Sequence, residues 1–488
     1  MRELTYQSIS FDPPGGWLHA MSHVLRQPSP LVLDSASVGP LARESVLSFA
    51  PAMLFSATGQ TATFQRGNHS ARIEGDPLAL FGRVERHARG EFSLSGDNIP
   101  RGYIGGWAGV LSFELRSFIE KLPPPKIGGP LFPDLHAGFY PWCLVLDHAS
   151  GQCELRLLAG MMGGHRDVRE LAGDLRELFT RPVPQDGNAQ SPFIEYQPRA
   201  GAGVGATYMS PLQATTREQW LEQVAAVKRC IYEGEIYQAN LTRMVRREGD
   251  FSAPALYEKL RAKSPAPFGG YFDCGLTRCV LSSSPELFLS VRQGLIETRP
   301  IKGTRPRGAT PDEDARLKAE LLASEKDRAE LVMIVDLERN DLGRICKAGS
   351  VRVPELCALH TYANVHHLEA TVQGELRAGV DFEQIIRATF PGGSISGAPK
   401  KRALEIIHEL EPVRRGPYTG SLFALSFNGD LVSNILIRTL LTDPRGVSYH
   451  VGCGITAESD EAAEWEESLA KGHGMEEALK AFEHEGTT

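Results

Sequence analysis

Residues 298–308 read TRPIKGTRPRG and hold one lysine, Lys302, between Pro300 and Gly303. The proline fixes its own φ, and the glycine permits a tight turn directly after the lysine. We therefore expect the local backbone to hold the lysine side chain in a defined position. Three arginines stand within five residues of it, and their charge, together with burial, would disfavour its protonated form. A neutral amine is what nucleophilic catalysis by lysine requires. Composition by itself favours a solvated basic loop instead, so the stretch leaves both interpretations open.

Composition excludes several classes of protein. The chain has 488 residues and a net charge of −8, which argues against a nucleic-acid-binding surface because such surfaces need clustered basic charge. Its 42% hydrophobic and 23% charged residues are typical of a globular protein with a sizeable core. The longest apolar stretch, Ala137–Leu146, is too short to span a membrane. The polar N-terminus does not resemble a signal peptide, and eight scattered cysteines indicate a reduced, cytoplasmic protein.

A segment rich in proline and glycine divides the chain. Residues 181–215 contain several prolines and the run AGAGVGA at 200–206, with little hydrophobic periodicity. This composition predicts a linker or surface excursion. It would separate an N-terminal domain of α+β character, residues 1–180, from a catalytic domain, residues 216–488.

Helices and strands are easier to predict in the second part. Thr216 can cap a helix that ends near Gly234, with Gln219 completing a capping box. Hydrophobic periodicity predicts further helices and strands. The expected helices are 166–179, 311–324, 325–344, 398–410 and 461–472. The clearest expected strands are 139–146, 286–291, 295–299, 421–427, 431–441 and 447–451.

Three glutamates of this part suggest a metal site. Glu464 and Glu467 are three residues apart on one predicted helix, so they share a face. Glu330 lies on another predicted helix. Oxygen ligands without nearby histidine suit Mg²⁺, which keeps waters and lets an acidic substrate complete its shell. A solvated helix face explains the same spacing, so both interpretations stay open.

Two glycine-rich segments are weaker candidates. Residues 390–400, FPGGSISGAPK, form a glycine loop that opens a helix, a natural site for an anion. The pattern differs from a nucleotide P-loop, so a ligand that bears a carboxylate is the better interpretation. Cys453 stands between Gly452 and Gly454, but its surroundings do not match a nucleophile elbow. A small residue in a glycine turn is the simpler explanation.

Taken together, these segments resemble one family. The ordered motifs are Ser284–Glu286, Pro300–Thr304, Arg328–Glu330, Val335–Gly343, Phe390–Lys400, Tyr418–Gly420, Ile437–Thr439 and Glu464–Glu467. They resemble the chorismate-utilising enzymes, which include anthranilate, aminodeoxychorismate, isochorismate and salicylate synthases. The resemblance covers about residues 216–472. It implies an α/β (α+β) fold of the anthranilate synthase component I type, with two facing, mainly antiparallel sheets flanked by helices and an active-site cleft between them.

The resemblance also implies roles for individual residues. Mg²⁺ and the ring carboxylate of chorismate would be held by Glu330, Glu464 and Glu467. The enolpyruvyl carboxylate would be bound by Arg438, Lys400, Tyr449 and the N–H groups around Gly452 and Gly454. Lys302 would attack the ring, Glu286 would serve as acid and base, and His367 would position the ring or donate a proton. Thr304 and Gln238 are also expected to contact the substrate.

Lys302 indicates the branch within the family. Anthranilate and isochorismate synthases typically have alanine before the Gly-Thr pair, whereas aminodeoxychorismate synthases, transferases of p-aminobenzoate and folate biosynthesis, have lysine. Gln238 stands where the water-adding enzymes carry lysine and fits an ammonia user. Anthranilate synthase component I is the alternative, and a catalytically silent ligand-binding homologue is another. The region that resembles the family runs almost to the end of the 488 residues, and a glutaminase would need roughly another domain length. Ammonia is therefore expected from a separate glutaminase subunit. Cys453 departs from the family pattern, in which this position is usually glycine or alanine.

Overall fold

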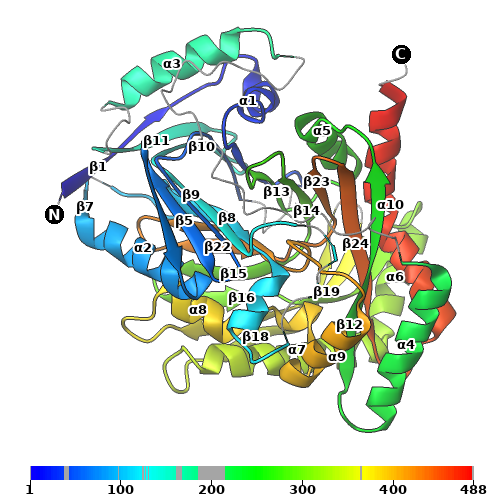
Figure 1. Ribbon diagram of the computed structural model, residues 1–488. Helices are drawn as coiled ribbons and strands as arrows, with labels where there is room; N and C mark the ends of the chain where they lie inside the picture. Colours follow the sequence, from blue (N-terminus) through cyan, green and yellow to red (C-terminus); the bar gives the residue numbers. More distant parts are fainter. Residues whose placement is uncertain are drawn as a thin grey trace.

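Two large β-sheets carry most of the chain in the computed structural model, and helices cover their outer faces (Figure 1). The structure describes residues 2–37, 43–96, 98–123, 126, 128–129, 131–160, 167–184, 215–362 and 365–485. Most of the predicted linker, residues 181–215, therefore lies outside the described residues. Both sheets are almost wholly antiparallel, because β1 with β7 is the one parallel pair among the described strands. The predicted architecture is confirmed.

The first sheet has twelve strands in the order β20-β12-β24-β23-β14-β13-β2-β3-β10-β11-β1-β7. Their bounds are β1 Arg2–Ser10, β2 Leu31–Asp34, β3 Glu44–Ser48, β7 Phe92–Ser95, β10 Trp142–Asp147, β11 Cys153–Ala159, β12 Gln238–Glu248, β13 Phe268–Asp273, β14 Cys279–Ser284, β20 Gly397–Ala398, β23 Thr439–Asp443 and β24 Gly446–Ile455.

The second sheet also has twelve strands, in the order β17-β19-β16-β15-β22-β21-β8-β9-β4-β5-β6, with β18 paired to β19 outside this path. Their bounds are β4 Met53–Thr58, β5 Thr61–Arg66, β6 His69–Glu74, β8 Gly106–Leu111, β9 Leu135–Tyr140, β15 Leu287–Arg292, β16 Leu295–Thr298, β17 Ile301–Pro306, β18 Arg352–Thr361, β19 Val365–Glu375, β21 Ser421–Ser426 and β22 Leu431–Asn434.

Both sheets contain strands from both predicted domains. In the first sheet β13 pairs with β2, and in the second sheet β21 pairs with β8. Each of these pairs joins a strand before residue 181 to one after residue 215. The two segments thus build their sheets together.

Sequence signals predicted α3, α4, α6, α7, α9 and α10, whereas α1, α2, α5 and α8 were not predicted. Their bounds are α1 Gly16–Val24, α2 Pro77–Glu91, α3 Val168–Thr180, α4 Arg217–Tyr232, α5 Ala253–Lys263, α6 Pro311–Ala323, α7 Glu325–Gly343, α8 Phe382–Thr389, α9 Lys400–Leu410, α10 Glu461–Glu485 and the 3₁₀ turns η1 Phe113–Phe118 and η2 Gly393–Ile395. The predicted capping box of α4 is confirmed, with Gln219 N 3.2 Å from Thr216 Oγ1 and Thr216 N 3.0 Å from Gln219 Oε1. Helix α10 is longer than predicted, because Met475, Ala478 and Leu479 continue its buried face.

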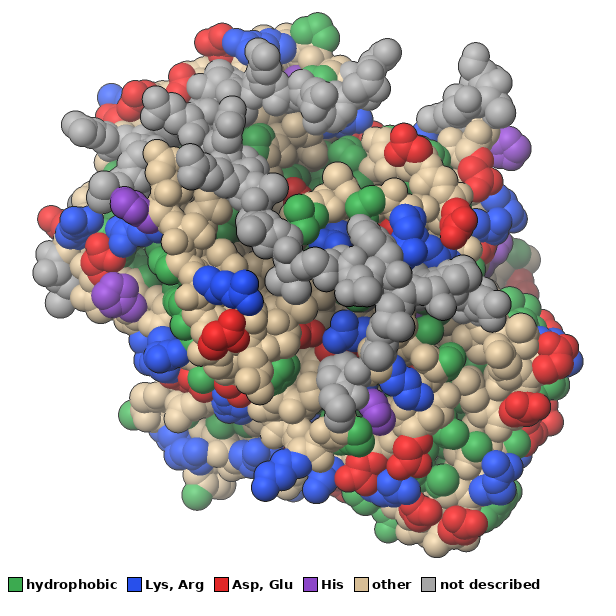
Figure 2. Space-filling view, viewed as in Figure 1, with side chains coloured by type: hydrophobic (Ala, Val, Ile, Leu, Met, Phe, Trp, Pro, Cys, Tyr) green, Lys and Arg blue, Asp and Glu red, His purple; other side chains and the backbone are tan. Residues whose placement is uncertain are grey.

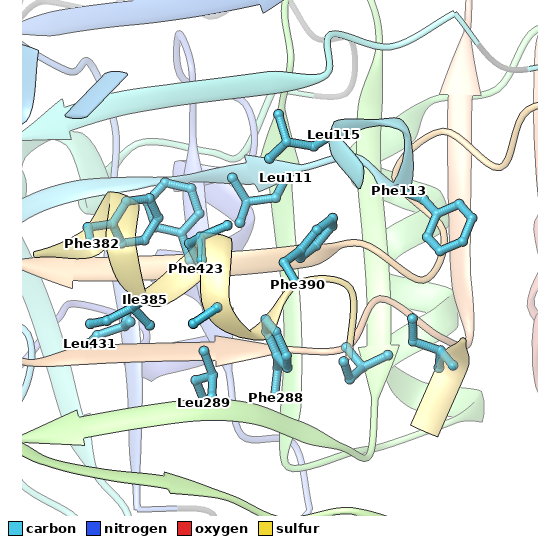
Figure 3. Packing of buried hydrophobic residues seen from close by; sticks show 14 of the residues in the cluster. Leu111, Phe113, Leu115, Phe288, Leu289, Phe382, Ile385, Phe390, Phe423 and Leu431 are labelled. Atoms are coloured by element: carbon cyan, nitrogen blue, oxygen red, sulfur yellow. The ribbon is translucent and has the colours of Figure 1, made fainter. Parts of the chain in front are cut away.

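Three apolar clusters hold these layers together. One fills the space between the sheets, where Leu31 and Val280 of the first sheet meet Val110 and Leu422 of the second. Another packs α1, α3, α5 and α10 against the first sheet. The largest packs α2, α7 and α8 against the second sheet. Figure 3 shows part of it, with Phe382 of α8 over Phe423 of β21 at 4.9 Å between ring centroids.

The chain crosses between the sheets at several sharp breaks. The predicted strand 431–441 is two strands, because β22 belongs to the second sheet and β23 to the first. Likewise β14 lies in the first sheet and β15 in the second. Glu286 and Arg438 stand in these two crossings, and Ile435 N donates to Glu286 O at 3.1 Å. The crossings therefore bring two of the predicted site residues to the boundary between the sheets.

The length and apolar character of the helices bear on whether the chain crosses a membrane, and the surface shows charges of both signs (Figure 2). Among the described residues, no helix combines the length and the apolar character that a bilayer crossing needs. On the face seen in Figure 2, lysine and arginine side chains are interspersed with aspartate and glutamate.

Candidate active site

Three of the predicted site residues, Lys302, Gln238 and Gly454, lie close together at one end of the two sheets. A Cβ placed on Gly454 of β24 would lie 2.2 Å from Nε2 of Gln238 and 3.5 Å from Nζ of Lys302. Lys302 therefore reaches from β17 of the second sheet to the β12–β24 pair of the first. A side chain at position 454 would displace the amide of Gln238 from its present place. The geometry joins residues more than 150 positions apart in the sequence.

Gln238 offers unused hydrogen-bonding capacity at this point. Its side chain is fully buried, and neither its amide oxygen nor its amide nitrogen has a partner among the described residues. Buried amide groups are normally satisfied, and leaving one unpaired costs roughly 1–3 kcal/mol. A polar molecule bound beside Lys302 would supply the missing partners.

The charge of Lys302 acts on two carboxyl groups, those of Glu286 and Glu330. Burial raises the pKa of Glu286 to about 7, although the hydrogen bond from Ser394 and the charge of Lys302 both oppose the rise. Oγ of Ser394 donates to Oε1 of Glu286 at 2.6 Å. Burial likewise raises the pKa of Glu330, and Lys302 opposes that rise. Glu286 is thus poised to exchange protons near neutral pH.

His367 is a neutral group in the same region. Its Nδ1 lies 2.8 Å from Oγ1 of Thr304, across the β17–β19 pair. Burial lowers the pKa of His367 to about 4, and the charge of Arg438 acts in the same direction. With Nδ1 occupied by Thr304, Nε2 is the ring atom left to contact a ligand.

Arg438 is an unpaired cation. It adopts a left-handed backbone conformation with φ of 50° in the crossing between β22 and β23. Burial lowers the pKa of its guanidinium, and no neighbouring charge contributes to the shift. Within the part of the chain that the structure describes, this guanidinium has no hydrogen bond or ion pair. A half-buried arginine with no partner among the described residues is well suited to bind a carboxylate.

The three predicted metal ligands lie on two helices. Glu464 and Glu467 share one face of α10, and their ligand atoms lie within 4.8 Å of each other. Oε2 of Glu464 is buried and finds no partner among the described groups. Burial raises the pKa of Glu330 of α7, and the negative charge of Glu467 contributes to the rise. Carboxylates with an unsatisfied buried oxygen fit a hard divalent cation such as Mg²⁺.

Two predicted contacts are engaged elsewhere. The ammonium of Lys400 donates to Asp341 Oδ2 at 2.5 Å, Pro391 O at 2.8 Å and Thr389 O at 3.1 Å, so all three of its protons are used. The hydroxyl of Tyr449 donates to Glu476 of α10. Tyr449 points to the face of β24 that packs on α10, because it is an odd number of residues from Gly452 and Gly454. The structure does not bring Lys400 or Tyr449 to Lys302.

The sequence profile of the chorismate binding enzymes matches residues 42–477. The chain belongs to this family. It is 38% identical over 418 residues to an aminodeoxychorismate synthase component 1 of Klebsiella aerogenes, with 85% of each chain covered. It is 36% identical over 416 residues to an anthranilate synthase component 1 of Haloarcula marismortui, covering 83% of this chain and 84% of that one.

A solved member of the family has the same fold. The crystal structure of anthranilate synthase component I from Streptococcus pneumoniae superposes with a TM-score of 0.72 at 26% identity. The match covers 90% of this chain and 93% of that one. Relatives with two different products match the chain about equally well, so similarity alone identifies a chorismate binding enzyme and leaves its product to the site residues.

Three residues of this chorismate binding enzyme were missed by sequence reasoning. Nζ of Lys471 donates to Gly452 O at 3.1 Å and to Glu467 Oε1 at 2.7 Å. The buried ring of Tyr418 stacks on His450 at 5.3 Å, and the charge of Lys471 bears on its pKa. Ser394 holds Glu286. Lys471 follows Glu467 by one helical turn, and Tyr418 belongs to the motif Tyr418–Gly420. The spacing and the motif could therefore have indicated these two residues.

One cavity in the described part of the chain lies away from these residues. It measures about 820 Å³, and its lining includes Asp34, Arg43, Tyr103, Arg292 and Asn434. Its lining contains none of the predicted catalytic, substrate-binding or metal-binding residues. This cavity is therefore separate from the candidate active site. The candidate site is recognised by buried polar atoms of Gln238 and Glu464 that have no partner among the described residues.

Proposed function

We propose that this chorismate binding enzyme is the synthase subunit, component I, that converts chorismate and ammonia to 4-amino-4-deoxychorismate. The proposal is supported chiefly by Lys302, whose amine lies near the unpaired amide of Gln238 and whose charge acts on two carboxyl groups, Glu286 and Glu330. An alanine at this position would leave the pocket without a nucleophile. The name of the Klebsiella aerogenes relative agrees with this assignment.

Lys302 would serve as the nucleophile of the first step. Its amine forms a bond to ring carbon 2, the two ring double bonds shift, and the bond from carbon 4 to its hydroxyl breaks. Glu286 in its protonated form gives its proton to the leaving oxygen, so that water departs. The carboxylate that results accepts the proton lost by the lysine nitrogen. Covalent catalysis divides one difficult substitution at carbon 4 into two allylic ones.

Ammonia completes the reaction in the second step. Its nitrogen forms a bond to carbon 4, the double bonds return, and the bond between Lys302 and carbon 2 breaks. Glu286 returns its proton to the lysine and takes one from the new ammonium. Chorismate and ammonia are thus converted to product and water, with no oxidant or reductant. The amide of Gln238 can orient ammonia, because ammonia both donates and accepts hydrogen bonds.

The two carboxylates of chorismate need cationic partners. The unpaired guanidinium of Arg438 suits the enolpyruvyl carboxylate. Lys471, rather than Lys400, supplies a second nearby cation through its contact with Gly452. Glu330, Glu464 and Glu467 would hold Mg²⁺, which when bound supplies positive charge for the ring carboxylate. His367 would contact the substrate through Nε2.

Ammonia is expected from a partner. The component 1 name of the relatives implies a second component. We propose a glutaminase subunit as that partner. Free ammonium salts should replace it in vitro, whereas glutamine should support the reaction only when the partner is added.

Product identification tests the proposal. The purified chain is incubated with chorismate, MgCl₂ and ammonium chloride, and the products are analysed by mass spectrometry and fluorescence. A product with the mass of 4-amino-4-deoxychorismate, without release of pyruvate, is expected. Fluorescent anthranilate and pyruvate would assign the enzyme to the anthranilate synthases instead. Recovery of unchanged chorismate would indicate a silent homologue.

A further inference from the structure

Cys453 places a thiol beside the carboxylates of the proposed metal site. It is fully buried in β24 between Gly452 and Gly454. Side chains alternate along a strand, so Cys453 points to the α10 face of β24, opposite to the glycines that border Lys302. Its Sγ, one carboxylate oxygen of Glu464 and one of Glu467 all lie within 4.8 Å of one another.

A buried ligand atom in this group has no partner. Glu464 is 4% exposed. Its Oε1 accepts a hydrogen bond from Ser459 at 2.7 Å, but Oε2 is buried without any contact to a donor in the described part of the chain. Sγ of Cys453 lies 3.5 Å from the backbone oxygen of Glu464, which holds the thiol against this helix turn. An unpaired carboxylate oxygen in a buried position calls for a donor or a cation.

The surroundings already attract positive charge. The ammonium of Lys471 sits 2.7 Å from Oε1 of Glu467. Its charge also acts on the thiol of Cys453. A divalent ion that bound Glu467 would compete with this ammonium.

Sulfur changes which ions such a site prefers. Carboxylates alone favour hard ions such as Mg²⁺, whereas thiolate favours softer ones. One sulfur and two oxygen ligands form a set that zinc accepts readily, with water in the remaining position. We propose that Cys453, Glu464 and Glu467 bind a thiophilic divalent cation of the zinc and cadmium class, in competition with Mg²⁺. The inference uses the metal role that we propose for Glu464 and Glu467, but it does not depend on which product the enzyme forms.

The binding step is a proton exchange. The bond between sulfur and hydrogen in Cys453 breaks, the proton passes to solvent, and a bond forms between sulfur and the metal ion. The two carboxylates add their oxygens, and Lys471 loses its ion pair with Glu467. Neither the ion nor the thiol changes oxidation state.

Cobalt provides a direct spectroscopic test. The metal-free protein is titrated with Co²⁺ without oxygen, and a sulfur-to-cobalt charge-transfer band in the near ultraviolet is expected. Calorimetric titration with Cd²⁺ and with Mg²⁺ is run in parallel. In Cys453→Ala the band should vanish and Cd²⁺ binding should weaken by roughly 10-fold or more, while Mg²⁺ binding changes by less than about 3-fold.

Matched variants separate this inference from its alternatives. Cys346 is also buried but belongs to no such ligand group among the described residues, so Cys346→Ala should keep both the band and Cd²⁺ affinity. Cys453→Ser keeps the size of the side chain and should still lose the band. A band that persists in the Cys453 variants, or equal weakening of Cd²⁺ and Mg²⁺ binding, would overturn the inference. Loss of amination with a Cys453-dependent band intact would count against the proposed function alone.

Discussion

Lys302 is the residue on which the proposed covalent step depends. We predict that Lys302→Ala forms no adduct with chorismate and loses at least about 10³-fold in amination rate, because the proposed covalent bond is made by the amine that the variant lacks. The measurement is intact-protein mass after acid quenching of a reaction without ammonia, together with the rate of product formation.

A matched lysine variant serves as the control. The ammonium of Lys347 is exposed and pairs with Glu375, so Lys347→Ala should form the adduct at the rate of the unchanged protein. An adduct of the same mass in Lys302→Ala would show that another group is the nucleophile.

Glu286 determines the expected dependence on pH. Its pKa is raised to about 7 by burial, so its protonated form predominates below that pH and disappears above it. Because the protonated form delivers the proton to the leaving hydroxyl, the rate should fall as pH rises through about 7. Glu286→Gln should remove this limb and lower kcat by about 10²- to 10⁴-fold. A limb with an unchanged midpoint in the variant would assign the titration to another group.

At the scale of elements, the glycine-rich segment 390–400 has a different role from the one its composition suggests. Its Ser394 holds Glu286, and its Gly397–Ala398 bridge pairs with the start of β12 at Gln238. Phe390 anchors it on Phe288 at 6.2 Å between ring centroids, as Figure 3 shows. The segment therefore positions the acid and the amide, and the expected carboxylate contact of its Lys400 is replaced by bonds within the protein.

This placement gives a prediction for Ser394→Ala. The hydrogen bond from Ser394 lowers the pKa of Glu286, so its loss should raise that pKa further and move the alkaline limb of the rate to higher pH. Ser396 of the same segment donates to backbone oxygens of Gly392 and Gly393 and not to Glu286. Ser396→Ala should therefore leave the midpoint in place. Equal shifts in both variants would indicate a general disturbance of the segment.

At the scale of the whole molecule, the two halves of the chain depend on each other. Without residues 1–184, strands β13 and β21 would lose their partners β2 and β8, and the cluster between the sheets would lose Leu31 and Val110. Exposed strand edges and apolar faces promote aggregation.

We therefore predict that residues 215–488 expressed alone do not fold cooperatively. Gel filtration and thermal unfolding followed by circular dichroism would measure this, and coexpression with residues 1–184 should restore a soluble complex. A monomeric fragment with a sharp unfolding transition would contradict the prediction and show an independent catalytic domain.

Local signals in the sequence predicted some of the elements, including six helices. The capping box at Thr216, the periodicity of α6 and α7, and the spacing of Glu464 and Glu467 depend on residues within one or two turns. The break between β22 and β23 was not predicted, because the apolar run 431–441 continues through it. The run divides where its first part pairs with strands of the second sheet and its second part with strands of the first sheet. These partner strands lie far away in the sequence.

The sequence by itself determined the family and the fold class, and its ordered motifs and local spacing selected Lys302, Glu286 and the three glutamates as candidate site residues. The tertiary structure decided which of those groups meet. In the structure Lys302 lies near Gly454 and Gln238, and burial raises the pKa of Glu286 to about 7. Lys400 donates its hydrogen bonds within the protein, and Tyr449 donates to Glu476 of α10. The physical reason is that partners and burial depend on contacts between segments far apart in the chain, which no local pattern records.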